Sequence, residues 1–214
     1  MPDWQSILPA EQWEHLRHDL SFHAVIKVAR ITNTLRFAHQ AAFSVEDSDA
    51  PAATRQRLSS FLYTVALLYE ALRFTETLGK YFCDWSSYRD GFGALHGDKD
   101  TTQLRSGILQ RARDKAVFHI DNSLPATSLA EFALGAPYVF AASNSDLAID
   151  VHYALADSVF LHFVLDTPSD GDDFKKRFVE AFTGVMALAT RFADSADRLI
   201  SEFLVREGGS MQAE

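Results

Sequence analysis

The chain carries one concentrated group of basic residues, between Lys99 and His119, although its formal net charge is −9. Lys and Arg side chains bind the phosphate groups of nucleic acids, so this segment is a candidate for phosphate binding. The alternative is a solvated helix face with scattered positive charges. Five basic residues stand against two acidic ones, which gives a local net charge of +3: Lys99, Arg105, Arg111, Arg113 and Lys115 against Asp100 and Asp114.

The same segment contains the one motif that we find, RDKAVFH from Arg113 to His119. An imidazole that titrates near neutral pH suits acid–base catalysis. Six positions along an ideal α-helix turn about 600°, so the side chains of Arg113 and His119 point about 120° apart. They converge only through the reach of the arginine, a distorted helix or a facing second copy. In a purely structural role, Arg113 would pair with Asp114 or another acid, and His119 would face the negative end of the helix dipole.

Other histidines are weaker candidates for chemistry. His15 and His18 lie close enough on one expected helix to share a metal ion, and that possibility stays open. Metal sites in helical bundles, however, use carboxylate–histidine pairs three residues apart on several helices. Glu14 precedes His18 by four residues, and no second helix has a matching pair, so we expect solvated or core-edge histidines and no metal. His152 and His162 lie in apolar surroundings, where we expect buried rings with satisfied nitrogens.

Composition indicates a globular protein of 214 residues, with 47% hydrophobic and 23% charged residues. We expect a single domain over residues 1–214. No apolar run is long enough to span a membrane, and the N-terminal stretch is too polar for a secretory signal. Cys83 is the only cysteine, so we expect no disulfide framework and a reducing, cytoplasmic location. The acidic balance argues against a broad nucleic-acid-binding face, and any such surface must be local. We expect no cofactor.

Apolar residues recur at steps of three and four along most of the chain, which predicts an all-α bundle of long amphipathic helices. The last of them has the clearest pattern, a run of Phe, Val, Ala and Leu ended by Gly208 and Gly209. ALADSVFLHFVL is expected to form a further short, buried helix. The four long helices are predicted at about 9–44, 51–83, 101–121 and 171–206.

Two stretches interrupt the helical pattern. Residues 84–100 contain three glycines and many polar groups, which predicts a loop with at most a short helical turn. The glycine spacing resembles a phosphate-binding loop, but that motif requires a preceding strand and we disfavour it here. Residues 138–143 and 147–153 flank SNSD and can pair as a small β-hairpin, although their alanines also suit a helix.

The motif and the helices around it resemble HEPN domains. Those domains carry an R-x(4–6)-H motif with a polar residue usually following the arginine, and Arg113, Asp114 and His119 match it. The motif lies on an expected helix that follows two long helices, and LLYEALRFTETLGKYF, with Glu70 and Glu76, is similar to the acidic second helix often found there. The resemblance covers residues 10–123. Residues 124–214 would be a C-terminal elaboration packed on that core.

The resemblance implies a metal-independent endoribonuclease, often a toxin or a defence effector, in which two protomers form one cleft. His119 would act as general base on a ribose 2′-hydroxyl or as acid toward the leaving 5′-oxygen. Arg113 would hold the scissile phosphate, and Asp114 would orient either Arg113 or His119. Arg105, Arg111 and Lys115 would bind the RNA. The expected partners are a second copy and a cognate antitoxin or regulatory protein. The alternative is a non-catalytic HEPN-like binding or interaction module.

Overall fold

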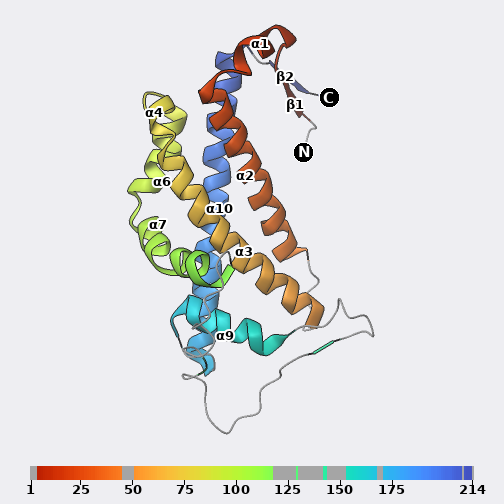
Figure 1. The fold of residues 1–214 in the computed structure, drawn as a ribbon, viewed down its shortest axis with the longest axis vertical. Coiled ribbons are helices and arrows are strands. Elements are labelled where there is room, and N and C mark those ends of the chain that lie inside the picture. Colours follow the sequence, from red (N-terminus) through yellow and green to blue (C-terminus); the bar gives the residue numbers. More distant parts are fainter. Residues whose placement is uncertain are drawn as a thin grey trace. The chain divides into compact units, whose positions relative to one another are not determined.

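A computed structural model describes residues 4–44, 51–117, 129, 142–143, 153–167, 171–208 and 210–213. Helices account for most of these residues and form a helical bundle, so the predicted all-α fold is confirmed. Figure 1 shows α2, α3 and α10 as the long helices. The elements are β1 (Trp4–Ile7), η1 (Ala10–Gln12), α1 (Trp13–Leu16), α2 (Leu20–Phe43), α3 (Pro51–Glu76), α4 (Gly79–Phe82), α5 (Ser86–Tyr88), η2 (Arg89–Gly93), α6 (Ala94–Gly97), α7 (Lys99–Leu104), η3 (Arg105–Leu109), η4 (Ala112–Val117), α9 (Ala154–Leu165), α10 (Gly171–Arg206) and β2 (Ser210–Ala213).

Contacts divide the chain into two compact units, and the division does not fall at residue 123. Unit 1 contains Met1–Thr34, Ala71–Asp98 and Thr190–Glu214, and unit 2 contains Leu35–Glu70 and Lys99–Ala189. Helices α2, α3 and α10 therefore each contribute residues to both units. The expectation of one domain over residues 1–214 stays a prediction.

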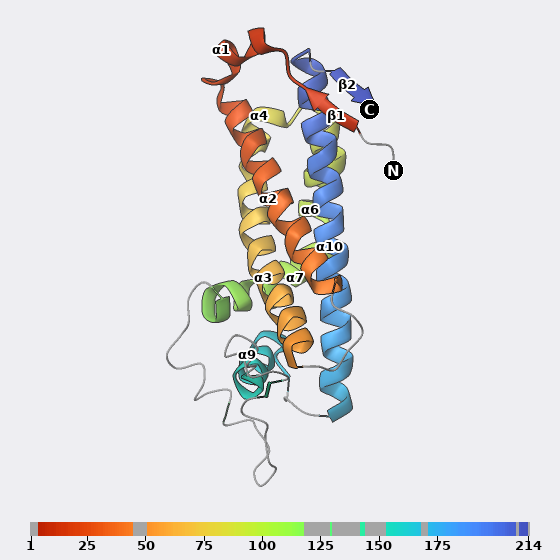
Figure 2. The same ribbon diagram turned by 90° about the vertical axis from the view of Figure 1, so that its right-hand side faces the viewer.

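Unit 1 has an aromatic core. Phe22 of α2 stacks on Phe203 of α10 with ring centroids 5.7 Å apart, and Phe92 of η2 meets Phe192 of α10 at 5.1 Å. The two chain termini pair beside this core as an antiparallel β1–β2 ribbon, visible in Figure 2. Unit 2 has a core of the same kind, because Phe61 of α3 packs on Phe178 and Phe182 of α10.

Helix α10 follows the prediction closely. It begins at Gly171 and ends at Arg206, and Gly208 beyond it takes the left-handed conformation (φ 74°) that favours glycine at a helix end. Six residues of the predicted apolar stripe are fully or almost fully buried. The first three phenylalanines of the stripe, Phe174, Phe178 and Phe182, are half-buried. The buried six are Val185, Ala189, Phe192, Ala196, Leu199 and Phe203. The predicted short helix is also confirmed, as α9.

The apolar spacing predicted a first long helix that runs without a break from residue 9, and the structure differs from this prediction. The helix breaks after α1, and α2 starts at Leu20 because Asp19 caps its first turn. The Asp19 carboxylate accepts hydrogen bonds from the backbone N–H groups of Ser21 (2.6 Å) and Phe22 (3.3 Å) and from the Ser21 hydroxyl. These N–H groups have no partner within the helix, so an aspartate here satisfies them. Trp13 is consequently half-exposed rather than part of a continuous buried face.

Removing this cap is expected to destabilise unit 1. Burial raises the pKa of Asp19, but the hydrogen bonds from Ser21 and Phe22 outweigh it and leave the pKa below its ordinary value. The carboxylate thus stabilises the fold above the unfolded-state pKa of about 4, and this contribution disappears as the pH falls through the folded-state pKa. Asp19→Ala should cost about 1 kcal/mol at pH 7 and progressively less below about pH 4. Urea unfolding of wild type and Asp19→Ala at several pH values measures this loss of stability. The control Asp19→Asn keeps a capping oxygen and should lose little stability at pH 7.

The predicted helix 51–83 is also interrupted, and the predicted loop 84–100 is wrong. α3 ends at Glu76, α4 follows at Gly79, and residues 86–97 form a further helical stretch through α5, η2 and α6. Close packing explains Gly91 in this stretch and Gly79 before it, whereas an added Cβ atom on Gly97 would meet nothing within 4 Å. A Cβ atom on Gly91 would lie 3.0 Å from the Cβ of Ser195 on α10, and one on Gly79 would lie 3.1 Å from the Tyr88 hydroxyl.

Two glycines make a matched test of this explanation. Gly91→Ala should destabilise the protein by about 1–3 kcal/mol because α10 must move away. Gly107 lies in η3, where an added Cβ would meet nothing within 4 Å. Gly107→Ala should therefore stabilise by about 0.4–1 kcal/mol through the unfolded state. Thermal melts of the two variants should shift in opposite directions, and equal shifts would rule out close packing as the reason for Gly91.

Little β-structure accompanies the helices in the described residues. Apart from β1 and β2, Ala142 is a single bridge residue. The predicted hairpin at 138–153 lies outside the described residues except for Ala142, Ser143 and Tyr153. Among the described helices, none has a stretch of the length and apolar character needed to cross a bilayer.

Candidate functional site

The segment that carries the basic residues is helical from Lys99 to Val117, but it is not a regular α-helix. η3 and η4 are π-helical, and η4 carries Arg113 and Asp114. π-Helical turns are rare and occur frequently at functional sites, because the wider turn displaces side chains from their α-helical directions. The expected helix 101–121 is therefore found as far as residue 117, with a distortion that sequence periodicity did not predict.

Arg113 is held by two acids. Its Nε donates a hydrogen bond to Glu70 Oε1 at 2.6 Å, and its Nη1 donates to Asp114 Oδ1 at 2.8 Å. The guanidinium carbon also lies 5.9 Å from the centre of the Tyr69 ring, within the range of a cation–π contact. Tyr69 and Glu70 belong to α3, so the arginine joins η4 to α3 within unit 2. The Arg113 side chain is 26% exposed and can still meet a ligand from solvent.

The electrostatics of this group fix the charge of the arginine. Hydrogen bonds from Arg113 to Asp114 and Glu70 raise the pKa of its guanidinium above the ordinary value. Arg113 consequently stays protonated at any pH at which the protein folds. Its Nη2 makes no hydrogen bond within the described residues and remains a donor. Two carboxylates face one guanidinium, however, so the formal charge of the group is negative.

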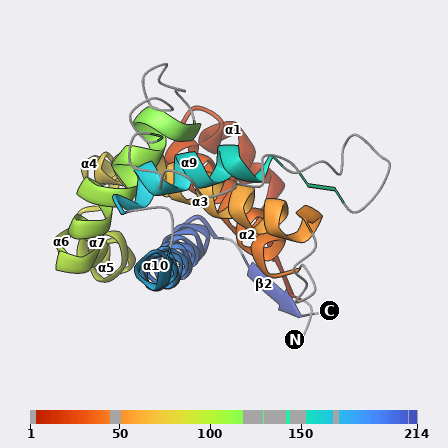
Figure 3. The same cartoon turned by 90° about the horizontal axis from the view of Figure 1, so that it is seen from below.

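The three basic residues expected to bind RNA have different surroundings. Arg111 Nε donates to the Val164 carbonyl at 3.0 Å, and its Nη1 lies 3.9 Å from Asp166 Oδ2. This arginine therefore satisfies a carbonyl at the C-terminal end of α9, which Figure 3 shows beside the 99–117 stretch. Arg105 is half-buried. Lys115 lies in η4, and its side chain is outside the described residues.

The structure describes some of the histidines that the sequence singled out and leaves out others. His119 and His152 lie outside the described residues. His162 is buried and its Nδ1 pairs with the Thr167 carbonyl, which confirms the expectation of a satisfied core histidine. His18 Nε2 accepts a hydrogen bond from Arg17 Nε at 3.0 Å. Within the described residues, no three His, Cys, Asp or Glu side chains gather as metal ligands.

Sequence reasoning did not identify Glu70 and Tyr69 as site residues. Glu70 had been noted only as part of an acidic helix, and 43 residues separate it from Arg113. The signal that was available is the pairing of an acidic helix with a basic one. It does not identify which acid meets which base, because that depends on the rotation of each helix about its axis and here on the π-helical turn.

The fold and this cluster define an all-α protein with an anchored arginine on a distorted helix. Comparison with protein-family models, with curated proteins and with solved structures finds no match to this chain.

Proposed function

We propose that this protein is a HEPN-like, metal-independent endoribonuclease of the toxin or defence type, with Arg113, Asp114 and His119 as its catalytic residues. The observation that carries the proposal is the anchoring of Arg113: Asp114 and Glu70 fix two of its nitrogens, and Nη2 makes no hydrogen bond to the part of the chain that the structure describes. A charged donor held in place before substrate binds is what stabilisation of a phosphoryl transition state requires. The π-helical turn at this position adds support.

In the proposed reaction, His119 removes the proton from a ribose 2′-hydroxyl, and the 2′-oxygen attacks the adjacent phosphorus. Arg113 stabilises the extra negative charge on the phosphate oxygens. The bond from phosphorus to the 5′-oxygen breaks, and the leaving oxygen takes a proton from an imidazolium. The products are a 2′,3′-cyclic phosphate and a 5′-hydroxyl. The His119 of a second protomer can supply that proton if the enzyme is a homodimer with one shared cleft.

A second candidate is a non-catalytic HEPN-like module that binds a protein such as a cognate antitoxin or a regulatory partner. One observation favours it: Arg113 faces two carboxylates, and their combined charge repels a phosphate. In that case the arginine joins η4 to α3, and its role is structural. The basic residues Arg105, Arg111 and Lys115, proposed to bind RNA in the enzyme, would then contribute to the partner surface or to the fold.

Incubation of the purified protein with single-stranded RNA in EDTA separates the two candidates, because the proposed roles need no metal. The enzyme should cut RNA, and His119→Ala should slow cleavage by roughly a hundredfold, the usual contribution of acid–base catalysis. His119→Ala should melt at the wild-type temperature. Absence of cleavage across a panel of RNAs, with capture of a specific protein partner, would favour the module. A variant that melts much earlier than wild type would assign His119 a structural role.

A further inference from the structure

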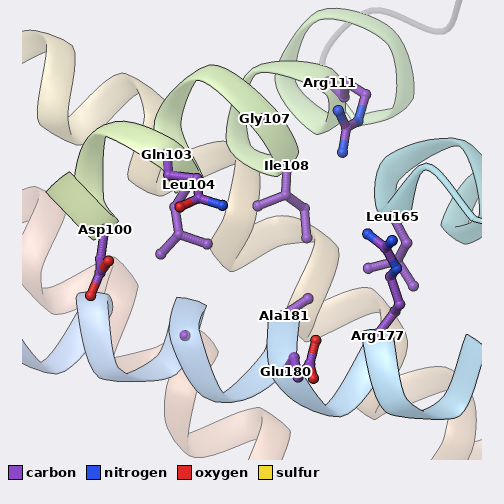
Figure 4. A pocket seen from close by; sticks show the side chains of 11 residues that line it. Asp100, Gln103, Leu104, Gly107, Ile108, Arg111, Leu165, Arg177, Glu180 and Ala181 are labelled. Atoms are coloured by element: carbon purple, nitrogen blue, oxygen red, sulfur yellow. The ribbon is translucent and has the colours of Figure 1, made fainter. Parts of the chain in front are cut away.

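Unit 2 contains a groove of about 450 Å³ between the 99–111 stretch and α10. Leu165 of α9 closes one end, and the walls carry the apolar side chains of Leu104, Ile108 and Ala181, as Figure 4 shows. Its volume falls in the range of small-molecule sites, which are mostly apolar with a few polar groups that fix the ligand. The groove thus has the size and lining of a site for one small organic ligand.

Two arginines reach into the groove at the Leu165 end (Figure 4). Arg111 projects from the 99–111 stretch, with Nε held by the Val164 carbonyl and Nη1 3.9 Å from Asp166. Arg177 projects from α10 and makes no hydrogen bond or ion pair within the part of the chain that the structure describes. A pair of guanidiniums from two elements, one of them without a partner among the described residues, suits a phosphate group, which accepts several charge-assisted hydrogen bonds.

Acidic and amide groups lie elsewhere in the groove. Figure 4 shows Asp100 at the end away from the two arginines, with Gln103 nearby. Glu180 also lines the groove, but it forms no ion pair with Arg177 or Arg111 within the described residues. A ligand that fits must therefore be anionic at one end and donate hydrogen bonds at the other.

Glycines keep the groove open. A Cβ atom on Gly107 would meet nothing within 4 Å, and one on Gly184 would touch only the Leu104 side chain at 3.7 Å. Larger residues could occupy both positions without a clash against the backbone. Packing of the fold therefore does not require glycine at either position. A flat apolar group can lie along Leu104 and Ile108 where the glycines leave room.

We propose that this groove binds a purine nucleoside 5′-monophosphate with an exocyclic amino group, such as AMP. The phosphate lies between Arg111 and Arg177, the base packs on Leu104 and Ile108, and its amino group donates to Asp100. This site goes beyond the proposed RNA cleavage. It is tested by binding alone, so its failure leaves the RNA-cleavage proposal unaffected, and the reverse also holds.

Isothermal titration of the full chain with AMP, adenosine and inorganic phosphate tests the proposal. AMP should bind more tightly than adenosine or phosphate alone, because only AMP uses both ends of the groove. Arg177→Gln should weaken AMP binding at least about tenfold, the loss expected for one charge-assisted contact. Lys176→Gln removes the same charge from the neighbouring exposed position, which does not line the groove, and should leave binding unchanged.

Gly107→Leu supplies an independent steric test, since the added side chain occupies the groove, and it should abolish AMP binding. If Gly107→Leu fails to fold, the pair Arg177→Gln and Lys176→Gln still decides the question. The proposal is overturned if AMP does not bind at millimolar concentration, or if Arg177→Gln and Lys176→Gln weaken AMP binding equally. Inorganic phosphate binding as tightly as AMP would also overturn it, because the apolar wall would then contribute nothing.

Discussion

Arg113→Ala should slow RNA cleavage by about a hundredfold or more, because the transition state loses the positive charge assigned to stabilise its phosphate oxygens. Arg113→Lys should recover little of this rate, since an ammonium cannot contact Glu70, Asp114 and a phosphate oxygen together as a forked guanidinium can. Single-turnover rates on one RNA substrate measure both variants. The loss should appear in the rate of the bound complex, as expected for an interaction made in the transition state.

Arg73→Ala is the matched control, because Arg73 is an exposed arginine on α3, three residues from Glu70, with no side-chain partner within the described residues. It should cleave at the wild-type rate. Equal losses in Arg73→Ala and Arg113→Ala would reflect general electrostatic attraction to RNA and would remove the specific role of Arg113. Full activity in Arg113→Ala would contradict the assignment of this residue to catalysis.

Phe61→Ala should destabilise the protein by about 3–5 kcal/mol, the range for deleting a large aromatic side chain from a packed core. Phe61 is completely buried, and its ring centroid lies 5.4 Å from that of Phe178 and 5.7 Å from that of Phe182. The substitution leaves a cavity between α3 and α10 within unit 2. Urea unfolding measures the change as a lower midpoint at constant slope.

Phe37→Ala controls for the loss of a phenyl ring as such. Phe37 is 71% exposed on the unit 2 part of α2, and its truncation should change stability by less than about 0.5 kcal/mol. Similar costs for Phe61→Ala and Phe37→Ala would contradict the assignment of Phe61 to the core.

The elements that sequence predicted best are those with a long, regular apolar pattern. α10 has the predicted bounds because apolar positions recur over its whole length, and a single run of 36 residues leaves no other period that fits. The break before α2 was missed because the same apolar spacing continues through it. The signal was local, an aspartate at residue 19 with Ser21 behind it, and a capping residue was given less weight than periodicity.

The helical stretch at 86–97 was missed for a different reason. Glycines are frequent in loops, but at Gly91 the absence of a side chain lets α10 approach at Ser195. That contact joins residues more than 100 positions apart, and no local pattern predicts it. The site is similar: Arg113 and Asp114 were identified from the motif, whereas the partner Glu70 and the π-helical turn depend on tertiary packing.

One measurement tests the central proposal most directly. A single-stranded RNA and the same RNA with one 2′-deoxy nucleotide at the mapped cleavage position are incubated with the wild-type protein in EDTA. The proposed reaction predicts that the all-ribose strand is cut to a 2′,3′-cyclic phosphate end, and that the deoxy substitution blocks cleavage at that position because the attacking oxygen is absent. Cleavage of the deoxy strand at the same rate, or products that carry a 5′-phosphate, would contradict it.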